Sequence, residues 1–246
     1  MTDGVKFDEL WAAIGPGDGR PGPGLDLRGR AVDIEGAYGL QDLLVARLGP
    51  TCGVKIAANS PPLLKAFGIN EPLAGHIVGA TPRAPQVAWD DFRELVVEPE
   101  FVAVLGRDVE APVADVRDVI DYFVPGFEVL ERRGLSTPHG PTAVAHNVFN
   151  AGVVVGDGRM TLDAARAASV RFIQNGRVLG EGTGTAPQDP GDAVAFLVGH
   201  VLSRGGQLRR GDYLLCGTHY PPIAVTEALN FTFETGGGAA HLTVTG

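Results

Sequence analysis

Cysteine is scarce in this sequence, with only Cys52 and Cys216 among 246 residues. Two cysteines exclude both a disulfide scaffold and a cysteine-rich zinc site. Positive charge is also in deficit, because 20 Lys and Arg residues stand against 29 Asp and Glu residues and give a formal net charge of −9. This balance argues against binding to nucleic acid or to an anionic membrane through a broad basic face.

Long hydrophobic runs are missing as well. The longest strongly apolar stretch, 193–202, is interrupted by Gly199 and His200 and is far shorter than a membrane span. The N-terminus has no basic segment followed by an apolar run, so no signal peptide is expected. We therefore predict a cytoplasmic protein with no membrane and no nucleic-acid partner.

Three common functional motifs are absent from the sequence: G-x-S-x-G, H-E-x-x-H and G-x-x-x-x-G-K-[ST]. Their absence argues against a nucleophile-elbow hydrolase, a zinc metalloprotease and a P-loop nucleotide-binding protein. Glycine (35 residues) and proline (18 residues) are abundant instead, without a collagen-like period. Many turns, and hence a β-rich protein, are expected.

Hydrophobic spacing predicts a mixture of elements that does not alternate as βαβ units. Helices are expected at 7–14, 40–48, 61–67, 113–120 and from Pro190 to about 202, and strands at 54–57, 95–105, 170–174, 177–179, 213–216, 231–234 and 242–244. Asn175-Gly176 is the strongest hairpin signal, and 15–24 is expected to be a flexible loop. The fold class is therefore α+β, with a helical N-terminal segment at 1–50 and a β-rich domain at 51–246.

The most informative stretch is the predicted strand 95–105, where Glu98 and Glu100 share one face. Both faces of this strand are largely apolar, so two adjacent carboxylates there call for a positive partner, and a hard divalent cation is one explanation. The alternative is an edge strand with a solvated acidic face, which Pro99 favours. Glu128, which has apolar neighbours, is the candidate third ligand, and an outward-facing strand residue is its alternative.

Two further residue types could carry chemistry. Lys55 lies in an otherwise apolar predicted strand, where it either extends to solvent or pairs with a buried carboxylate. His146 and His219 lie beside predicted loops. Each histidine is either a structural hydrogen-bonding group or a group that transfers protons.

Six sequence blocks, in order, resemble the fumarylacetoacetate hydrolase superfamily. The most similar branch is that of the 2-hydroxypenta-2,4-dienoate (2-keto-4-pentenoate) hydratases and 4-oxalocrotonate decarboxylases. The blocks are V-K-I-A-A-N-S, F-G-I-N-E-P-L-A-G-H-I, V-E-P-E-F-V-A-V-L-G-R-D, V-P-G-F-E-V-L-E-R-R, H-N-V-F-N-A-G-V-V-V-G and G-D-Y-L-L-C-G-T. The resemblance covers about residues 30–246, and E-P-E with its following G-R-D is the most specific part.

The resemblance implies a mixed β-sandwich roll behind a small helical N-terminal portion. It also implies a Mg²⁺ or Mn²⁺ ion held by Glu98, Glu100 and Glu128, which chelates a small anionic 2-oxo or 2-hydroxydienoic acid and stabilises its enolate. Lys55 is then a catalytic residue beside the substrate. The substrate-binding residues carried over from the blocks are Ser60, Asn147, Gly217 and Thr218.

The chain also departs from the family pattern. The acidic residue expected after the E-P-x-x-G block is missing, and the D-N pair has become His146-Asn147. The departures predict a changed substrate or reaction, with His146 as a replacement proton-transfer group, since the usual pKa of histidine is near neutrality.

Three activities remain open from the sequence. The first is a metal-dependent lyase, with hydratase ahead of decarboxylase. The second is a hydrolase that cleaves a C–C bond of an acylpyruvate, and the third is a non-catalytic partner subunit. Because the family is generally oligomeric, the resemblance also implies a homo-oligomer and a possible association with a related family enzyme.

Overall fold

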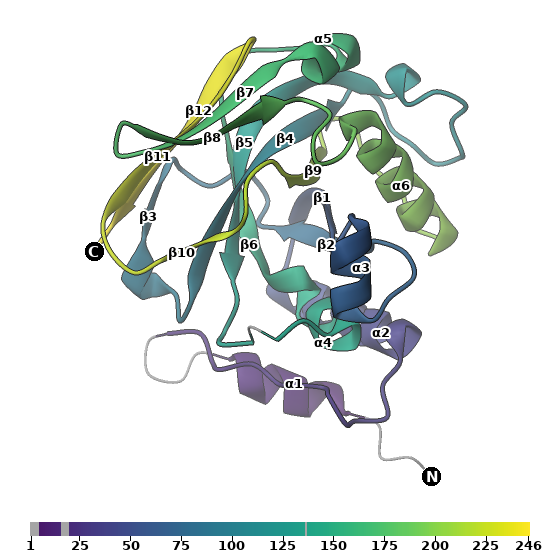
Figure 1. The fold of residues 1–246 in the computed structure, drawn as a ribbon. Helices are drawn as coiled ribbons and strands as arrows, with labels where there is room; N and C mark the ends of the chain where they lie inside the picture. The colour runs from purple at the N-terminus through teal and green to yellow at the C-terminus, as the bar shows by residue number, and fades with distance from the viewer. Residues whose placement is uncertain (1–4, 16–19, 136) are drawn as a thin grey trace.

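The computed structural model describes residues 5–15, 20–135 and 137–246, and it has the predicted α+β architecture (Figure 1). The larger of its two sheets has the strand order β2-β1-β9-β4-β5-β6, and β10 pairs with β4 beyond the end of β9. Its strands are β1 (Thr51–Ala57), β2 (Leu73–Val78), β4 (Leu95–Leu105), β5 (Ile120–Glu131), β6 (Asn150–Val155), β9 (Tyr213–Thr218) and β10 (Ile223–Val225).

The smaller sheet covers one face of the larger sheet. Its order is β3-β12-β11-β7-β8, formed by β3 (Gln86–Ala88), β12 (Gly238–Thr245), β11 (Leu229–Thr235), β7 (Ser169–Gln174) and β8 (Arg177–Thr183). Phe127 of β5 packs against Phe172 and Phe231, and Phe101 of β4 packs against Phe233. These rings belong to the main hydrophobic core, which fills the space between the sheets.

Helices and short 3₁₀ turns surround the sheets. They are α1 (Phe7–Ile14), α2 (Ile34–Leu48), α3 (Pro61–Phe67), α4 (Gly140–Ala145), α5 (Leu162–Ala167), α6 (Pro190–Ser203), η1 (Trp89–Asp91), η2 (Val116–Asp118) and η3 (Asn147–Phe149). In Figure 1, α1, α2 and α4 lie together below the sheets. A second core joins them, and it includes Leu10 and Leu44 from before residue 50 and Leu73 and Val144 from after it. No helix in the described ranges is long and apolar enough to cross a membrane.

Most of the elements expected from the sequence are present. Helix α6 begins where Asp189 caps it, because the Asp189 side chain accepts hydrogen bonds from the backbone N–H groups of Gly191 and Asp192. The β7–β8 hairpin turns at Asn175 and Gly176, both with positive φ. In the predicted loop 15–24, residues 16–19 lie outside the described residues, and the rest forms neither helix nor strand.

The helix predicted at 113–120 is wrong. Only the short turn η2 forms there, and β5 begins at Ile120, which pairs with Leu105 of β4. Val113 and Val116 have helical spacing, but Val113 packs on the main core from a loop and Val116 from the first residue of η2. A helix and a loop that leads into a strand can both point apolar residues at this spacing toward the core. The spacing alone therefore could not distinguish between them.

Candidate metal centre

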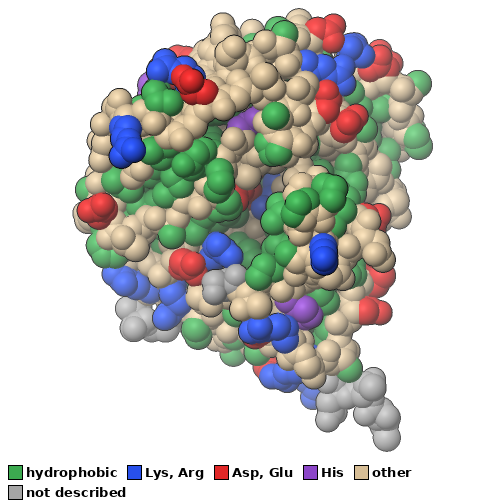
Figure 2. All heavy atoms as spheres, in the orientation of Figure 1, with side chains coloured by type: hydrophobic (Ala, Val, Ile, Leu, Met, Phe, Trp, Pro, Cys, Tyr) green, Lys and Arg blue, Asp and Glu red, His purple; other side chains and the backbone are tan. Residues whose placement is uncertain are grey.

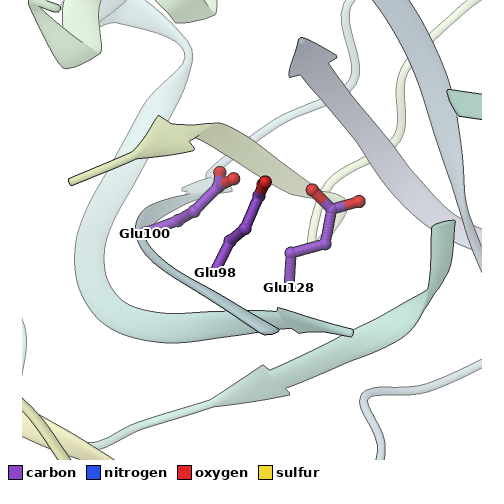
Figure 3. Close-up of side chains that lie close together, drawn as sticks. All are labelled: Glu98, Glu100 and Glu128. Atoms are coloured by element: carbon purple, nitrogen blue, oxygen red, sulfur yellow. The ribbon is translucent and has the colours of Figure 1, made fainter. Parts of the chain in front are cut away.

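Three glutamates project from the face of the larger sheet that does not carry the phenylalanine core. Because side chains alternate along a strand, Phe101 faces the smaller sheet while Glu98 and Glu100 face the other way. Strand β5 pairs antiparallel with β4 and places Glu128 directly opposite Glu98. One carboxylate oxygen from each glutamate lies within 4.8 Å of the others. Figure 3 shows the three carboxyl groups gathered in one place.

Each of the two fully buried carboxylates has one oxygen held by a hydrogen bond and one oxygen without a hydrogen-bond donor. Glu100 Oε2 accepts a hydrogen bond of 2.7 Å from the backbone N–H of Gly217, and Glu128 Oε1 accepts one of 2.7 Å from Asn150 Nδ2. Glu100 Oε1 has no hydrogen-bond donor among the described residues, and Glu128 Oε2 has none in hydrogen-bond geometry, although the Lys55 ammonium lies 3.1 Å from it. Buried acceptors without donors are costly, and a cation would satisfy both oxygens.

The electrostatics of the cluster also call for positive charge. Burial, followed by the Glu128 carboxylate, raises the pKa of Glu98 to about 7. Burial and both neighbouring carboxylates raise the pKa of Glu100 well above its usual value. Burial also raises the pKa of Glu128, against the opposing effect of Lys55. In the folded protein, burial and mutual repulsion therefore make the ionised form of these carboxylates costly in free energy.

Lys55 provides one positive charge at the cluster. It lies on β1 with 2% of its surface exposed, and its Nζ is 3.1 Å from Glu128 Oε2. This contact is an ion pair without the alignment of a hydrogen bond, because the same oxygen lacks a donor in good geometry. Burial alone would lower the pKa of Lys55, but the three glutamates outweigh it and the pKa is raised. Of the two interpretations of Lys55, the structure shows the buried pair.

The cluster fits a hard divalent cation. Three ionised carboxylates and one ammonium leave a net charge of −2, which a single divalent ion would neutralise. The available ligand atoms are all oxygens, which Mg²⁺, Mn²⁺ and Ca²⁺ prefer and which do not favour soft metals. Glu98, Glu100 and Glu128 are the only group of three or more candidate ligands found in the described ranges.

A cavity of about 290 Å³ opens beside these residues. Its polar lining comprises Lys55, Asn59, Glu98, Glu100, Arg132 and Thr218, together with Gly217. Its apolar lining comprises Ile56, Ala57, Ala58, Leu63, Phe67, Leu130, Pro138, Val148, Phe149 and Pro222. Figure 2 shows a hollow with charged side chains at its depth and hydrophobic side chains around it.

Gly217 is required by close packing at the cavity wall. Its φ is +96°, and a Cβ there would lie 2.6 Å from Gln188 Nε2 and 2.7 Å from Asn59 Nδ2. A side chain at this position would therefore be strained and crowded. Glycine lets the backbone approach Glu100 closely enough to donate the hydrogen bond that orients this carboxylate.

The structure places the other predicted site residues in two groups. Gly217 and Thr218 line the cavity with Lys55, whereas Ser60, His146 and Asn147 are not part of its lining. Ser60 occupies the N-cap position of α3 without a capping hydrogen bond from its side chain. The roles predicted for these residues stay predictions.

His146 and Asn147 have structural contacts. Nε2 of His146 lies 3.1 Å from the backbone nitrogen and 3.0 Å from the carbonyl oxygen of Leu25. Burial lowers the pKa of His146 to about 4, so the ring is neutral at pH 7. The Asn147 side chain accepts a hydrogen bond from the backbone N–H of His76 and donates one to its carbonyl oxygen, at 2.7 and 2.8 Å.

Sequence reasoning missed several residues around the cavity. Arg132 lines it, and Asn150 fixes Glu128 while accepting a 3.0 Å hydrogen bond from the backbone N–H of Val78. Phe149 reaches the wall from a left-handed turn in which φ is 53° at Asn147, 48° at Val148 and 64° at Phe149. Such backbone is rare for residues other than glycine, and it is found disproportionately at functional sites. No sequence pattern marks this turn.

The chain is similar to known hydratases. It is 30% identical over 207 residues to the TodF product hydratase of Pseudomonas putida F1, covering 78% of this chain and 77% of that protein. It is 29% identical over 215 residues to a 2-keto-4-pentenoate hydratase of Paraburkholderia phymatum, covering 80% of each. No family model matches the chain.

A solved structure has the same fold. The 4-oxalocrotonate decarboxylase from Pseudomonas putida G7, complexed with magnesium and adipate, superposes with a TM-score of 0.77 at 22% identity and 87% coverage of both chains.

Proposed function

The chain belongs to the hydratase and decarboxylase branch of the fumarylacetoacetate hydrolase superfamily, and on this premise we propose that it is a divalent-metal-dependent lyase that hydrates a small 2-oxo or 2-hydroxydienoic acid. Hydration is placed ahead of decarboxylation because the relatives at 29–30% identity are named hydratases. The decarboxylase, at 22% identity, supports the fold alone.

The observation that carries the proposal is the cluster of Glu98, Glu100 and Glu128 at the cavity, with two carboxylate oxygens that lack a hydrogen-bond donor and with net negative charge. These three side chains would hold Mg²⁺ or Mn²⁺. When bound, such an ion supplies Lewis-acid polarisation to the oxygens of a 2-oxo acid.

The chain's own residues have separate tasks in this proposal. Lys55 places an ammonium group at the edge of the cluster, where it attracts the anionic substrate and can donate a proton to a substrate atom. Arg132 adds a second cation to the cavity lining. Gly217 and Asn150 hold the Glu100 and Glu128 carboxylates in fixed orientations, so that little rearrangement accompanies binding.

We further propose that the chain works as a homo-oligomer in the cytoplasm, as expected for the branch. Leu43 and Leu48 on α2 are about half exposed, and a second copy of the chain could cover them. We propose that the same surface can also bind a related family enzyme.

The test combines binding with product analysis. Thermal unfolding is measured with Mg²⁺ or Mn²⁺, with and without oxalate, and a panel of 2-oxo and 2-hydroxydienoic acids is then incubated with the metal-loaded protein. A product heavier by one water supports hydration, loss of CO₂ indicates decarboxylation, and two acids from one substrate indicate C–C bond hydrolysis. Metal binding without turnover of any member of the panel would favour a non-catalytic partner subunit.

A further inference from the structure

Helix α3 presents apolar side chains that the rest of the chain covers only in part. None of its residues is buried, and Leu63 is 41% exposed, among the few large hydrophobic residues exposed to this degree in the described ranges. Leu63 and Phe67 are four residues apart, so they lie on one face of the helix, and both line the cavity. Phe67 also packs against the second core, so Leu63 is the more exposed side chain of this apolar wall.

Phe149 also lines the cavity, and its ring is held in place. The ring of His146 stacks on the Phe149 ring, with centroids 5.9 Å apart and an interplanar angle of 20°. Two residues before Phe149, the Asn147 side chain forms two hydrogen bonds with the His76 backbone and so ties this turn to β2. Pro138 and Pro222 are also among the apolar residues that line the cavity.

Positive charge in the cavity is confined to the glutamate end. Of the residues that line it, only Lys55 and Arg132 are cations, and both lower the pKa of Glu98 through their charge. The exposed Lys65 of α3 is not part of the lining. A second carboxylate placed against α3 would therefore lose hydration without gaining a charged partner.

We propose that Leu63, Phe67 and Phe149 form a tail subsite that selects an uncharged, apolar substituent on the carbon chain of the substrate and disfavours a second carboxylate. This inference rests on the proposed function, in which the 2-oxo acid head lies at the glutamates.

Binding of unreactive 2-oxo acids to the Mg²⁺-loaded protein tests the inference without any need for turnover. The series is pyruvate, 2-oxobutanoate, 2-oxopentanoate and 2-oxohexanoate, measured by calorimetry, with oxalate as the ligand that has a head but no tail. Each added methylene should lower the Kd by about fourfold until the cavity is filled. The pair 5-methyl-2-oxohexanoate and 2-oxoglutarate has the same shape, and the neutral member should bind at least about tenfold more tightly.

Two variants locate the effect. Leu63→Ser and Phe67→Ser should abolish most of the gain along the series while leaving the Kd of oxalate unchanged. Val178→Ser, which replaces an exposed hydrophobic residue of β8 outside the cavity, should leave both unchanged.

The outcomes separate the two proposals. If oxalate does not bind in the presence of the metal, the proposed function fails and the inference fails with it. If oxalate binds but tail length has no effect, or if the α3 variants keep the full gain, only the tail subsite is refuted. Tighter binding of 2-oxoglutarate that is lost in Arg132→Met would show that the cavity selects a dicarboxylate instead.

Discussion

Replacing Glu98 with glutamine should have opposite effects on stability in the absence and in the presence of metal. Burial and the Glu128 carboxylate raise the pKa of Glu98 from 4.5 to about 7. Because one pH unit corresponds to about 1.4 kcal/mol, the ionised side chain costs up to about 3 kcal/mol of metal-free stability. Glu98 is only partly buried, and solvent screening reduces the figure to about 2 kcal/mol.

The sign of this effect depends on pH. A carboxyl whose pKa is raised by folding destabilises the protein only where it is ionised, so the cost is absent below about pH 4.5 and complete above about pH 7. At about pH 8 in EDTA, Glu98→Gln should therefore unfold at a temperature roughly 4 to 8 °C higher than the wild type.

Metal should reverse this order. A cation at 100 times its Kd adds about 2.7 kcal/mol to the wild type, whereas the variant has lost one charged ligand and should gain much less at the same concentration. Scanning calorimetry of both proteins, in EDTA and in Mg²⁺ or Mn²⁺, measures the inversion. Glu227→Gln removes the same charge from an exposed residue and should follow the wild type in both conditions.

Two results would refute this reasoning. One is a variant that is less stable than the wild type in EDTA, which would mean that repulsion among the glutamates does not limit metal-free stability. The other is a full metal-dependent shift in Glu98→Gln, which would mean that the ion binds elsewhere.

Three further predictions follow from individual contacts. Lys55→Met leaves Glu128 buried without its ion pair, so chemical denaturation should show a loss of about 3 kcal/mol or more, with turnover abolished; unchanged stability would contradict the pairing. Asn150→Ala frees the Glu128 carboxylate, and calorimetric titration should show Mn²⁺ binding about tenfold or more weaker; an unchanged Kd would show that the amide does not position this ligand. Folding lowers the pKa of His146 from 6.5 to about 4, so between pH 6.5 and pH 4 the unfolded chain binds a proton at this ring and the folded chain does not. The free energy of unfolding of the wild type should therefore fall by about 3 kcal/mol as the pH drops through this range. His146→Phe should show a shallower pH dependence of stability, and an identical slope would argue against a buried neutral ring.

The sequence alone determined the strand that carries the centre. Alternation along residues 95–105 is a local property of extended backbone, and it placed Glu98 and Glu100 on one face before any partner was known. The same local rules predicted helices 7–14 and 61–67 and the Asn175-Gly176 turn, which the structure contains. They gave helix 113–120 incorrectly, because Val113 meets the core from a loop and Val116 from the first residue of η2.

Only the tertiary structure decided how the remaining groups converge. Glu128 lies opposite Glu98 because of the register between β4 and β5, and Lys55 reaches it because β1 lies on the other side of β9 from β4. Asn150 holds Glu128 from β6, and His146, which its side-chain chemistry favoured for proton transfer, is placed behind Phe149. Register and strand order depend on packing across the whole chain, whereas alternation depends on neighbouring residues. The sequence therefore identified the acidic side chains of the candidate centre, and the fold determined their partners and the shape of the cavity around them.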